Sequence, residues 1–205
     1  DGEFMVSHDG NLNRMFGYDF QIATLTTEQI KKYFMINGSN VDAYDNLTMP
    51  TFEQYLGVMK KNKEVHPFVE IKEELNDADL RKIVKQVKDA GLLNETYFIS
   101  VHQSNLLSLQ RLDGVNTSQL QYVYGAEDFN KTTSVTSSVI DWCISNQIDL
   151  DTRQSLVTAS DVYRLQTAGR QVNVWTVNTI EKAYDLVNKL HVDMITTEYM
   201  LNTEP

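Results

Sequence analysis

Short runs of β-branched and aromatic residues alternate with longer amphipathic stretches along most of this chain. The run at residues 68–72 precedes a stretch at 77–90, in which apolar side chains recur at helical spacing before Gly91. The pattern continues with runs at 97–101, 120–124, 148–150, 172–177 and 192–196. Strand-then-helix repetition of this kind predicts an α/β fold with a parallel sheet and right-handed crossovers.

Doubly wound sheets and (β/α)8 barrels share this alternation, and spacing alone does not separate them. The sequence contains neither G-x-G-x-x-G nor G-x-x-x-x-G-K-[ST], so the usual nucleotide-binding signatures are absent. The first 65 residues differ from the repeat. We expect a short strand at residues 3–7, a small helix near Thr26, and a helix that begins with a capping box at residues 51–54.

Composition narrows the function further. The chain has 18 Lys plus Arg against 28 Asp plus Glu, for a net charge of −10, which argues against a general nucleic-acid binder. Cys143 is the only cysteine, so neither an intrachain disulfide nor a thiolate zinc cluster can form. No apolar run approaches the roughly 20 residues that span a bilayer. The chain opens at Asp1 in a strand-like pattern without an initiator methionine, so we expect a segment upstream.

Polar residues at the carboxyl ends of strands are candidates for chemistry, because parallel barrels place their active sites there. The candidates are His8 and Asp9, Glu70 and Lys72, Trp175, Thr176 and Asn178, and Thr196, Thr197 and Glu198. His102 ends another strand and is a weaker candidate. His66 and His191 precede strands and therefore lie at the wrong end for catalysis.

Glu70 needs a partner, because an isolated buried charge is costly. Lys72 has the same side-chain parity and could supply a simple ion pair, or both residues could face a metal ion and a phosphate. His8 could act as a general acid or base, although an isolated histidine is more often structural. Trp175 could pack in the core or form an apolar wall for a ligand.

Five segments resemble motifs of the glycerophosphodiester phosphodiesterase family. Residues 1–9, with Leu12 and Arg14, are similar to the family's D-G-x-x-V-x-x-H-D-x-x-L-x-R segment. The other four are P-T-F-E at 50–53, V-E-I-K at 69–72, W-T-V-N at 175–178 and V-D-M-I-T-T-E at 192–198. They occur in the family's order and span nearly the whole chain.

The resemblance implies a single (β/α)8 TIM-barrel domain over residues 1–205 that hydrolyses glycerophosphodiesters to an alcohol and glycerol 3-phosphate. It implies that His8 is one of two catalytic histidines and that Glu70 is one of three carboxylate ligands to Ca²⁺ or Mg²⁺. Lys72 would bind the phosphate and Trp175 would form part of the substrate wall. In the family, the glycerol hydroxyl commonly attacks first and gives a cyclic phosphate, which water then opens.

The chain departs from the family pattern upstream of His8. The family's H-R-G motif, with the other histidine, and its E-x-D strand, with the other two metal ligands, are not present. We therefore expect a barrel without its first two strands, an N-terminally incomplete domain, and impaired activity of this chain alone. Smaller departures are Glu198 at the family's closing Asp and Met194 at its Gly.

Two alternatives remain open from the sequence. A non-catalytic barrel could bind a phosphate or polyol, or dock a partner through its open edge, and an unpaired edge strand makes a dimer plausible. A related lipid phosphodiesterase acting on choline- or sphingosine-bearing substrates is the other. The sequence leaves the compartment open: the parent protein could be secreted or attached to a membrane.

Overall fold

The computed structural model describes residues 1–126, 131–198 and 200–201. The chain divides into two compact units, Asp1–Val65 and His66–Pro205. The helices are α1 (Asn13–Phe16), α2 (Thr27–Ile30), α3 (Phe52–Met59), α4 (Asp77–Asp89), α5 (Gln103–Gln110), α6 (Ser137–Asn146), α7 (Ala159–Thr167) and α8 (Ile180–Asn188). The strands are β1 (Phe68–Glu70), β2 (Tyr97–Ser100), β3 (Leu120–Tyr124), β4 (Asp149–Arg153), β5 (Val172–Trp175) and β6 (Met194–Ile195).

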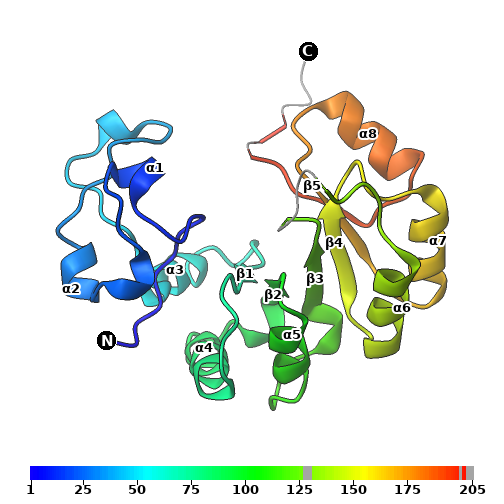
Figure 1. Cartoon of the computed structure of the whole chain (residues 1–205), viewed down its shortest axis with the longest axis horizontal. Coiled ribbons are helices and arrows are strands. Elements are labelled where there is room, and N and C mark those ends of the chain that lie inside the picture. The colour runs from blue at the N-terminus through cyan, green and yellow to red at the C-terminus, as the bar shows by residue number, and fades with distance from the viewer. Residues whose placement is uncertain (127–130, 199, 202–205) are drawn as a thin grey trace. The chain divides into compact units, whose positions relative to one another are not determined.

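The second unit is built on one parallel sheet with the strand order β1-β2-β3-β4-β5-β6 (Figure 1). Every neighbouring pair is parallel, from β1 with β2 to β5 with β6. The sheet is curled into a half-barrel, and β1 and β6 form its two edges within the described residues. The predicted α/β fold with a parallel sheet is therefore confirmed.

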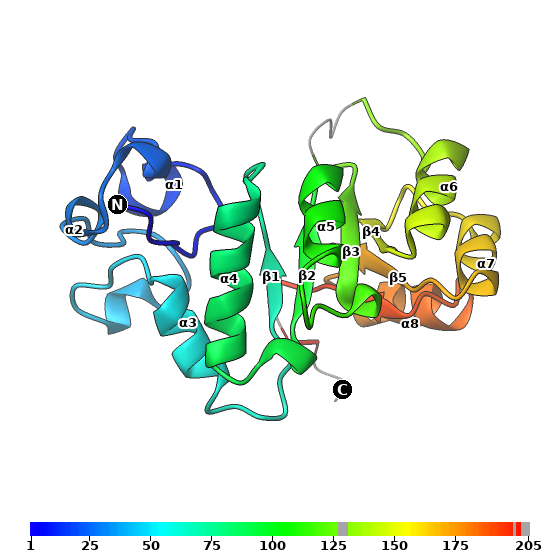
Figure 2. The same ribbon diagram turned by 90° about the horizontal axis from the view of Figure 1, so that it is seen from below.

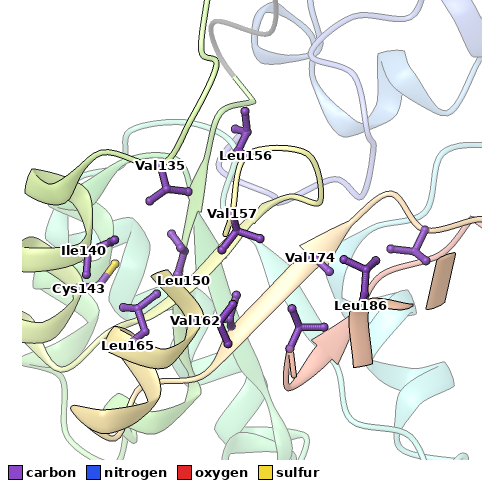
Figure 3. Close-up of a cluster of buried hydrophobic side chains, with 13 residues drawn as sticks. Val135, Ile140, Cys143, Leu150, Leu156, Val157, Val162, Leu165, Val174 and Leu186 are labelled. Carbon is purple, nitrogen blue, oxygen red and sulfur yellow. The ribbon is translucent and has the colours of Figure 1, made fainter. Parts of the chain in front are cut away.

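Helices cover one face of this sheet. Figure 2 shows α4 beside β1 and α5 beside β2 and β3, while α6 contacts β4 and α7 contacts β5. Beneath the later helices, Leu150 and Val174 of the sheet pack against Cys143 and Leu165 (Figure 3). This apolar cluster leaves the opposite face of the sheet free to carry polar side chains.

Local sequence signals explain where the helices begin and end. The Asn76 side chain accepts hydrogen bonds from the backbone N–H groups of Ala78 and Asp79 and so caps α4. Thr51 and Gln54 form the expected capping box at the start of α3. Gly91 adopts a φ of 74° after α4, a left-handed conformation that side chains disfavour.

Several expected strands differ in length from those in the structure. The expected strand 172–177 ends at Trp175, and the expected strand 192–196 is limited to Met194–Ile195. The expected strand at residues 3–7 is reduced to one antiparallel bridge between Met5 and Thr51.

The expected strand 148–150 is longer and runs from Asp149 to Arg153, with all five residues buried. In its second half, Asp151 and Arg153 lie on the face away from the helices. Thr152 lies on the same face as Leu150, and its hydroxyl donates to the backbone carbonyl oxygen of Tyr124 at 3.0 Å.

The first unit has its own small core. Leu12, Phe16, Ile30 and Met49 are almost fully buried and pack together. The Lys31 ammonium group donates to the backbone carbonyl oxygen of Met49 at 2.6 Å. The apolar cluster therefore gives this unit an interior of its own.

Candidate active site

The sheet register places the polar residues of several strands on one face. Glu70 is in register with Ile99, which is in register with Gln121. Asp151 is in register with Asn173. Because side chains alternate along a strand and registered residues share a face, these residues point away from the helices. We call this surface the polar face.

Buried amides cross the polar face in a hydrogen-bonded ladder. The Asn173 side-chain amide donates to Oε1 of Gln121 at 3.4 Å, and the Thr196 hydroxyl donates to Oδ1 of Asn173 at 3.3 Å. Gln121 is 0% exposed and Asn173 is 3% exposed. These contacts fix the interior of the half-barrel, since buried polar groups are costly unless they are hydrogen-bonded.

Glu70 and Lys72 lie at the carboxyl end of β1. Glu70 ends the strand, and Lys72 follows two residues later with the same parity. The ammonium nitrogen of Lys72 lies 2.6 Å from Oε2 of Glu70, and their side chains are 39% and 30% exposed. The structure therefore brings these two candidates together in an ion pair that solvent and a small ligand can reach.

Asp151 is a buried carboxylate on the same face and is not among the candidates predicted from the sequence. It is 3% exposed, and its Oδ1 atom has no hydrogen-bond partner in the described residues. Burial, and then the negative charge of Glu70, raise the pKa of Asp151 well above its ordinary value. The alternation of Asp, Leu and Asp at residues 149–151 is the signal that could have indicated it.

Trp175 ends β5 on the polar face, in register with Arg153 of β4. Trp175 is half-buried, and its indole nitrogen has no hydrogen-bond partner among the described residues. The Arg153 guanidinium donates to the backbone carbonyl oxygen of Thr132 at 2.7 Å. The indole therefore lies at the carboxyl end of the sheet, and its part in a substrate wall stays a prediction.

Asn178 and Glu198 lie beyond the ends of β5 and β6. The Asn178 amide donates to Oε2 of Glu198 at 2.8 Å, and the backbone N–H of Glu198 donates back to Oδ1 of Asn178 at 3.1 Å. These reciprocal bonds tie the two strand ends together. The polar side chains of both segments therefore stabilise the rim in addition to any part in binding.

His8 belongs to the first unit, whereas Glu70, Lys72 and Trp175 belong to the second. The Nδ1 atom of His8 lies 2.8 Å from Oδ1 of Asp9, and the Arg14 guanidinium donates to Oδ2 of Asp9 at 2.7 Å. The hydrogen bonds from Arg14 and then from His8 lower the pKa of Asp9. The ionised Asp9 orients the imidazole of His8. That His8 and Glu70 act on the same substrate stays a prediction.

The polar face offers oxygen ligands that suit a hard cation. Ca²⁺ and Mg²⁺ prefer carboxylate and carbonyl oxygens. Glu70 is partly exposed, and the unpartnered buried oxygen of Asp151 lies near enough to feel its charge. This donor chemistry fits a divalent cation. Residues 1–126, 131–198 and 200–201 contain no group of three or more His, Cys, Asp or Glu side chains arranged to hold a metal ion.

These features define an α/β protein of the TIM-barrel type with polar and charged groups at the carboxyl ends of its strands. The family model described as the glycerophosphoryl diester phosphodiesterase family matches residues 1–201. The chain therefore belongs to this family. A comparison with curated protein sequences gave no significant match.

Solved structures share the fold. A phosphodiesterase from Oleispira antarctica, solved with its product sn-glycerol-3-phosphate, has a TM-score of 0.80 and 21% identity over 97% of this chain and 77% of that chain. A glycerophosphodiester phosphodiesterase from Parabacteroides distasonis has a TM-score of 0.68 and 23% identity, over 95% of this chain and 73% of that chain. A glycerophosphodiester phosphodiesterase from Agrobacterium tumefaciens has a TM-score of 0.64 and 15% identity, over 95% of this chain and 77% of that chain.

None of the helices in the described part of the chain has the length and apolar composition that a membrane span requires.

Proposed function

We propose that this chain hydrolyses glycerophosphodiesters to an alcohol and glycerol 3-phosphate. The ion pair of Glu70 and Lys72 carries the proposal, because it places a carboxylate and a cation at the carboxyl end of a strand in a member of this family. The product bound to the Oleispira antarctica phosphodiesterase supports a glycerophosphodiester as the substrate class. The alcohol group stays unassigned.

Lys72 is the proposed phosphate-binding residue and Glu70 the proposed cation ligand. The Lys72 ammonium group can turn from Glu70 to a phosphate oxygen, since its side chain is 39% exposed. A bound Ca²⁺ or Mg²⁺ would neutralise the phosphodiester and polarise its phosphorus atom. Glu70 would hold that ion through a carboxylate oxygen.

His8 is the proposed acid–base residue. Because the Asp9 carboxylate accepts a hydrogen bond from Nδ1, the Nε2 atom of His8 is left to exchange a proton with the substrate. We propose that Nε2 takes the proton of an attacking glycerol hydroxyl, whose oxygen bonds to phosphorus while the bond from phosphorus to the alcohol oxygen breaks. The alcohol leaves after taking a proton from water, and a second water molecule then opens the cyclic phosphate to glycerol 3-phosphate. Trp175 is proposed to cover the glycerol carbons.

We further propose that the sheet is a barrel without its first two strands and that the chain is impaired in the sense that it turns over slowly and needs a high concentration of Ca²⁺ or Mg²⁺. Glu70 is one of three carboxylates that the family resemblance assigns to the cation, so we expect weak cation binding. The edges of β1 and β6 suit pairing with a second copy of the chain. Tight Ca²⁺ or Mg²⁺ binding in a titration, or a stable monomer on size-exclusion chromatography, would contradict these two expectations respectively.

The proposal is tested by the release of choline and glycerol 3-phosphate from glycerophosphocholine, with and without added Ca²⁺ or Mg²⁺. We expect cation-dependent release that His8→Ala reduces by about 10²- to 10⁴-fold, the usual contribution of a positioned acid or base. The matched control is His66→Ala, because His66 pairs with Glu95 before β1 and lies at the opposite end of the strand. Binding of the diester without turnover would instead favour a non-catalytic module.

A further inference from the structure

The backbone that follows Glu70 is held by side chains from one neighbouring segment. The Ser100 hydroxyl donates to the carbonyl oxygen of Ile71 at 2.7 Å, and Nε2 of His102 lies 3.1 Å from the carbonyl oxygen of Lys72. The Asn105 amide donates to the carbonyl oxygen of Glu73 at 2.8 Å. Three consecutive carbonyl groups, at residues 71–73, are therefore fixed by residues 100–105.

Asn105 is the centre of these contacts. It is 0% exposed, and its amide nitrogen donates both to the Glu73 carbonyl oxygen and to the Ser100 hydroxyl oxygen. Its Oδ1 atom accepts the backbone N–H of Leu75 at 3.0 Å. The Ser104 hydroxyl adds a bond of 2.6 Å to Oε1 of Glu74. The backbone N–H of Ile71 still donates to the carbonyl oxygen of Ile99 in β2 at 2.8 Å, whereas residues 72–75 have left the sheet ladder. The side chains of residues 100–105 take the place of the lost backbone partners.

His102 has a defined role in this arrangement. A carbonyl oxygen only accepts hydrogen bonds, so Nε2 of His102 carries the proton and donates to Lys72. The backbone N–H of His102 in turn donates to the Ser100 hydroxyl at 3.1 Å. This bond fixes the backbone of His102, and the imidazole contacts the residue whose ammonium group pairs with Glu70.

We propose that Ser100, His102 and Asn105 form a clamp that sets the direction of the Lys72 side chain toward Glu70 and the bound phosphate. His102 is a positioning residue in this clamp, because it touches the backbone of Lys72. The effect on catalysis rests on the proposed function, whereas the effect on the mobility of Lys72 does not. Groups that orient a binding residue in this way typically change affinity or activity by about 10- to 100-fold when removed.

Three variants of the 205-residue chain test the clamp. His102→Ala removes the donor to Lys72, His102→Gln retains a side-chain N–H of similar reach, and His66→Ala removes a histidine at the opposite end of the strand. One readout is the ¹⁵N order parameter of the Lys72 ammonium group, which we expect to fall in His102→Ala alone. The other is hydrolysis of glycerophosphocholine, where His102→Ala should lower kcat/KM about tenfold or more and His102→Gln should restore most of the loss.

A double-mutant cycle separates positioning from general destabilisation. If His102 acts through Lys72, His102→Ala has little further effect on kcat/KM in a Lys72→Met background, whereas independent effects would multiply. An unchanged order parameter of Lys72 in His102→Ala would overturn the clamp. A mobile Lys72 in His102→Ala together with an inactive wild-type chain would uphold the clamp and reject the proposed function.

Discussion

The ammonium nitrogen of Lys72 lies 2.6 Å from Oε2 of Glu70 at the carboxyl end of β1. Both side chains are partly exposed, so this ion pair adds little to stability by itself, since such pairs contribute about 0–1 kcal/mol. The pair lies on the polar face, and the negative charge of Glu70 acts on the buried carboxyl group of Asp151.

Lys72→Met should weaken phosphate recognition while leaving the fold intact. The variant keeps a long apolar side chain and removes the charge, so we expect the KM for glycerophosphocholine to rise about tenfold or more, the loss of roughly one charge-assisted hydrogen bond. Lys85→Met is the matched control, because Lys85 pairs with Asp89 on the exposed side of α4. Equal KM values in both variants would remove Lys72 from the phosphate site.

Asp149 should make the protein less stable as the pH rises. Burial raises the pKa of Asp149 from 3.8 to about 6, against the hydrogen bond from Gln171 and the charge of Arg170. The folded state therefore holds this proton more tightly than the unfolded chain does, so the stability it contributes is complete below about pH 4 and is lost by about pH 6. We expect this group to lower the free energy of unfolding by about 3 kcal/mol across that window.

Urea unfolding of Asp149→Asn between pH 4 and pH 7 measures this contribution. The variant should lose that part of the pH dependence, and its advantage over the wild type should grow as the pH rises toward 6. Asp141→Asn is the control, because Asp141 pairs with Arg164 and is 60% exposed. Parallel curves for the wild type and Asp149→Asn would contradict the raised pKa.

Alanine substitutions at Gly125 and Gly91 distinguish the cost of backbone strain from the cost of a steric clash. Both adopt positive φ, 88° and 74°, but a Cβ on Gly125 would lie 2.6 Å from Cδ1 of buried Leu156, whereas a Cβ on Gly91 would meet nothing within 4 Å. Gly91→Ala should cost about 1 kcal/mol from the backbone alone. Gly125→Ala should cost about 1–3 kcal/mol more, because Leu156 must move. Equal losses in the free energy of unfolding for the two variants, measured in urea, would show that the surroundings of Gly125 relax without cost.

The sequence allowed the sheet to be predicted because its helix-facing side is regular. In runs such as Tyr97–Ser100 and Leu120–Tyr124, every second residue faces the helices and is buried or partly buried there. These runs form strands, as expected. The capping box at Thr51 was also predictable, because its two hydrogen bonds depend on residues three apart. Local patterns of this kind do not depend on distant parts of the chain.

The site was only partly predictable for a physical reason. The pairing of Glu70 with Lys72 was predictable from their spacing of two residues at the end of an extended run, although β1 itself ends at Glu70. The burial of Asp151 depends on the placement of β4 in the middle of the sheet, and its polar neighbours made that strand look shorter than it is. The clamp on Lys72 likewise joins two segments that meet only when β1 and β2 pair.

The most direct test of the account is the rate at which Glu70→Gln hydrolyses glycerophosphocholine in the presence of Ca²⁺ or Mg²⁺. Glu95→Gln is the matched control, since Glu95 lies just before β2 and forms its ion pair with His66, just before β1, at the amino ends of these two strands. The account predicts release of glycerol 3-phosphate by the wild type and Glu95→Gln, and a rate at least about 100-fold lower in Glu70→Gln. Equal rates in the wild type and Glu70→Gln would show that the carboxyl end of β1 is not the active site.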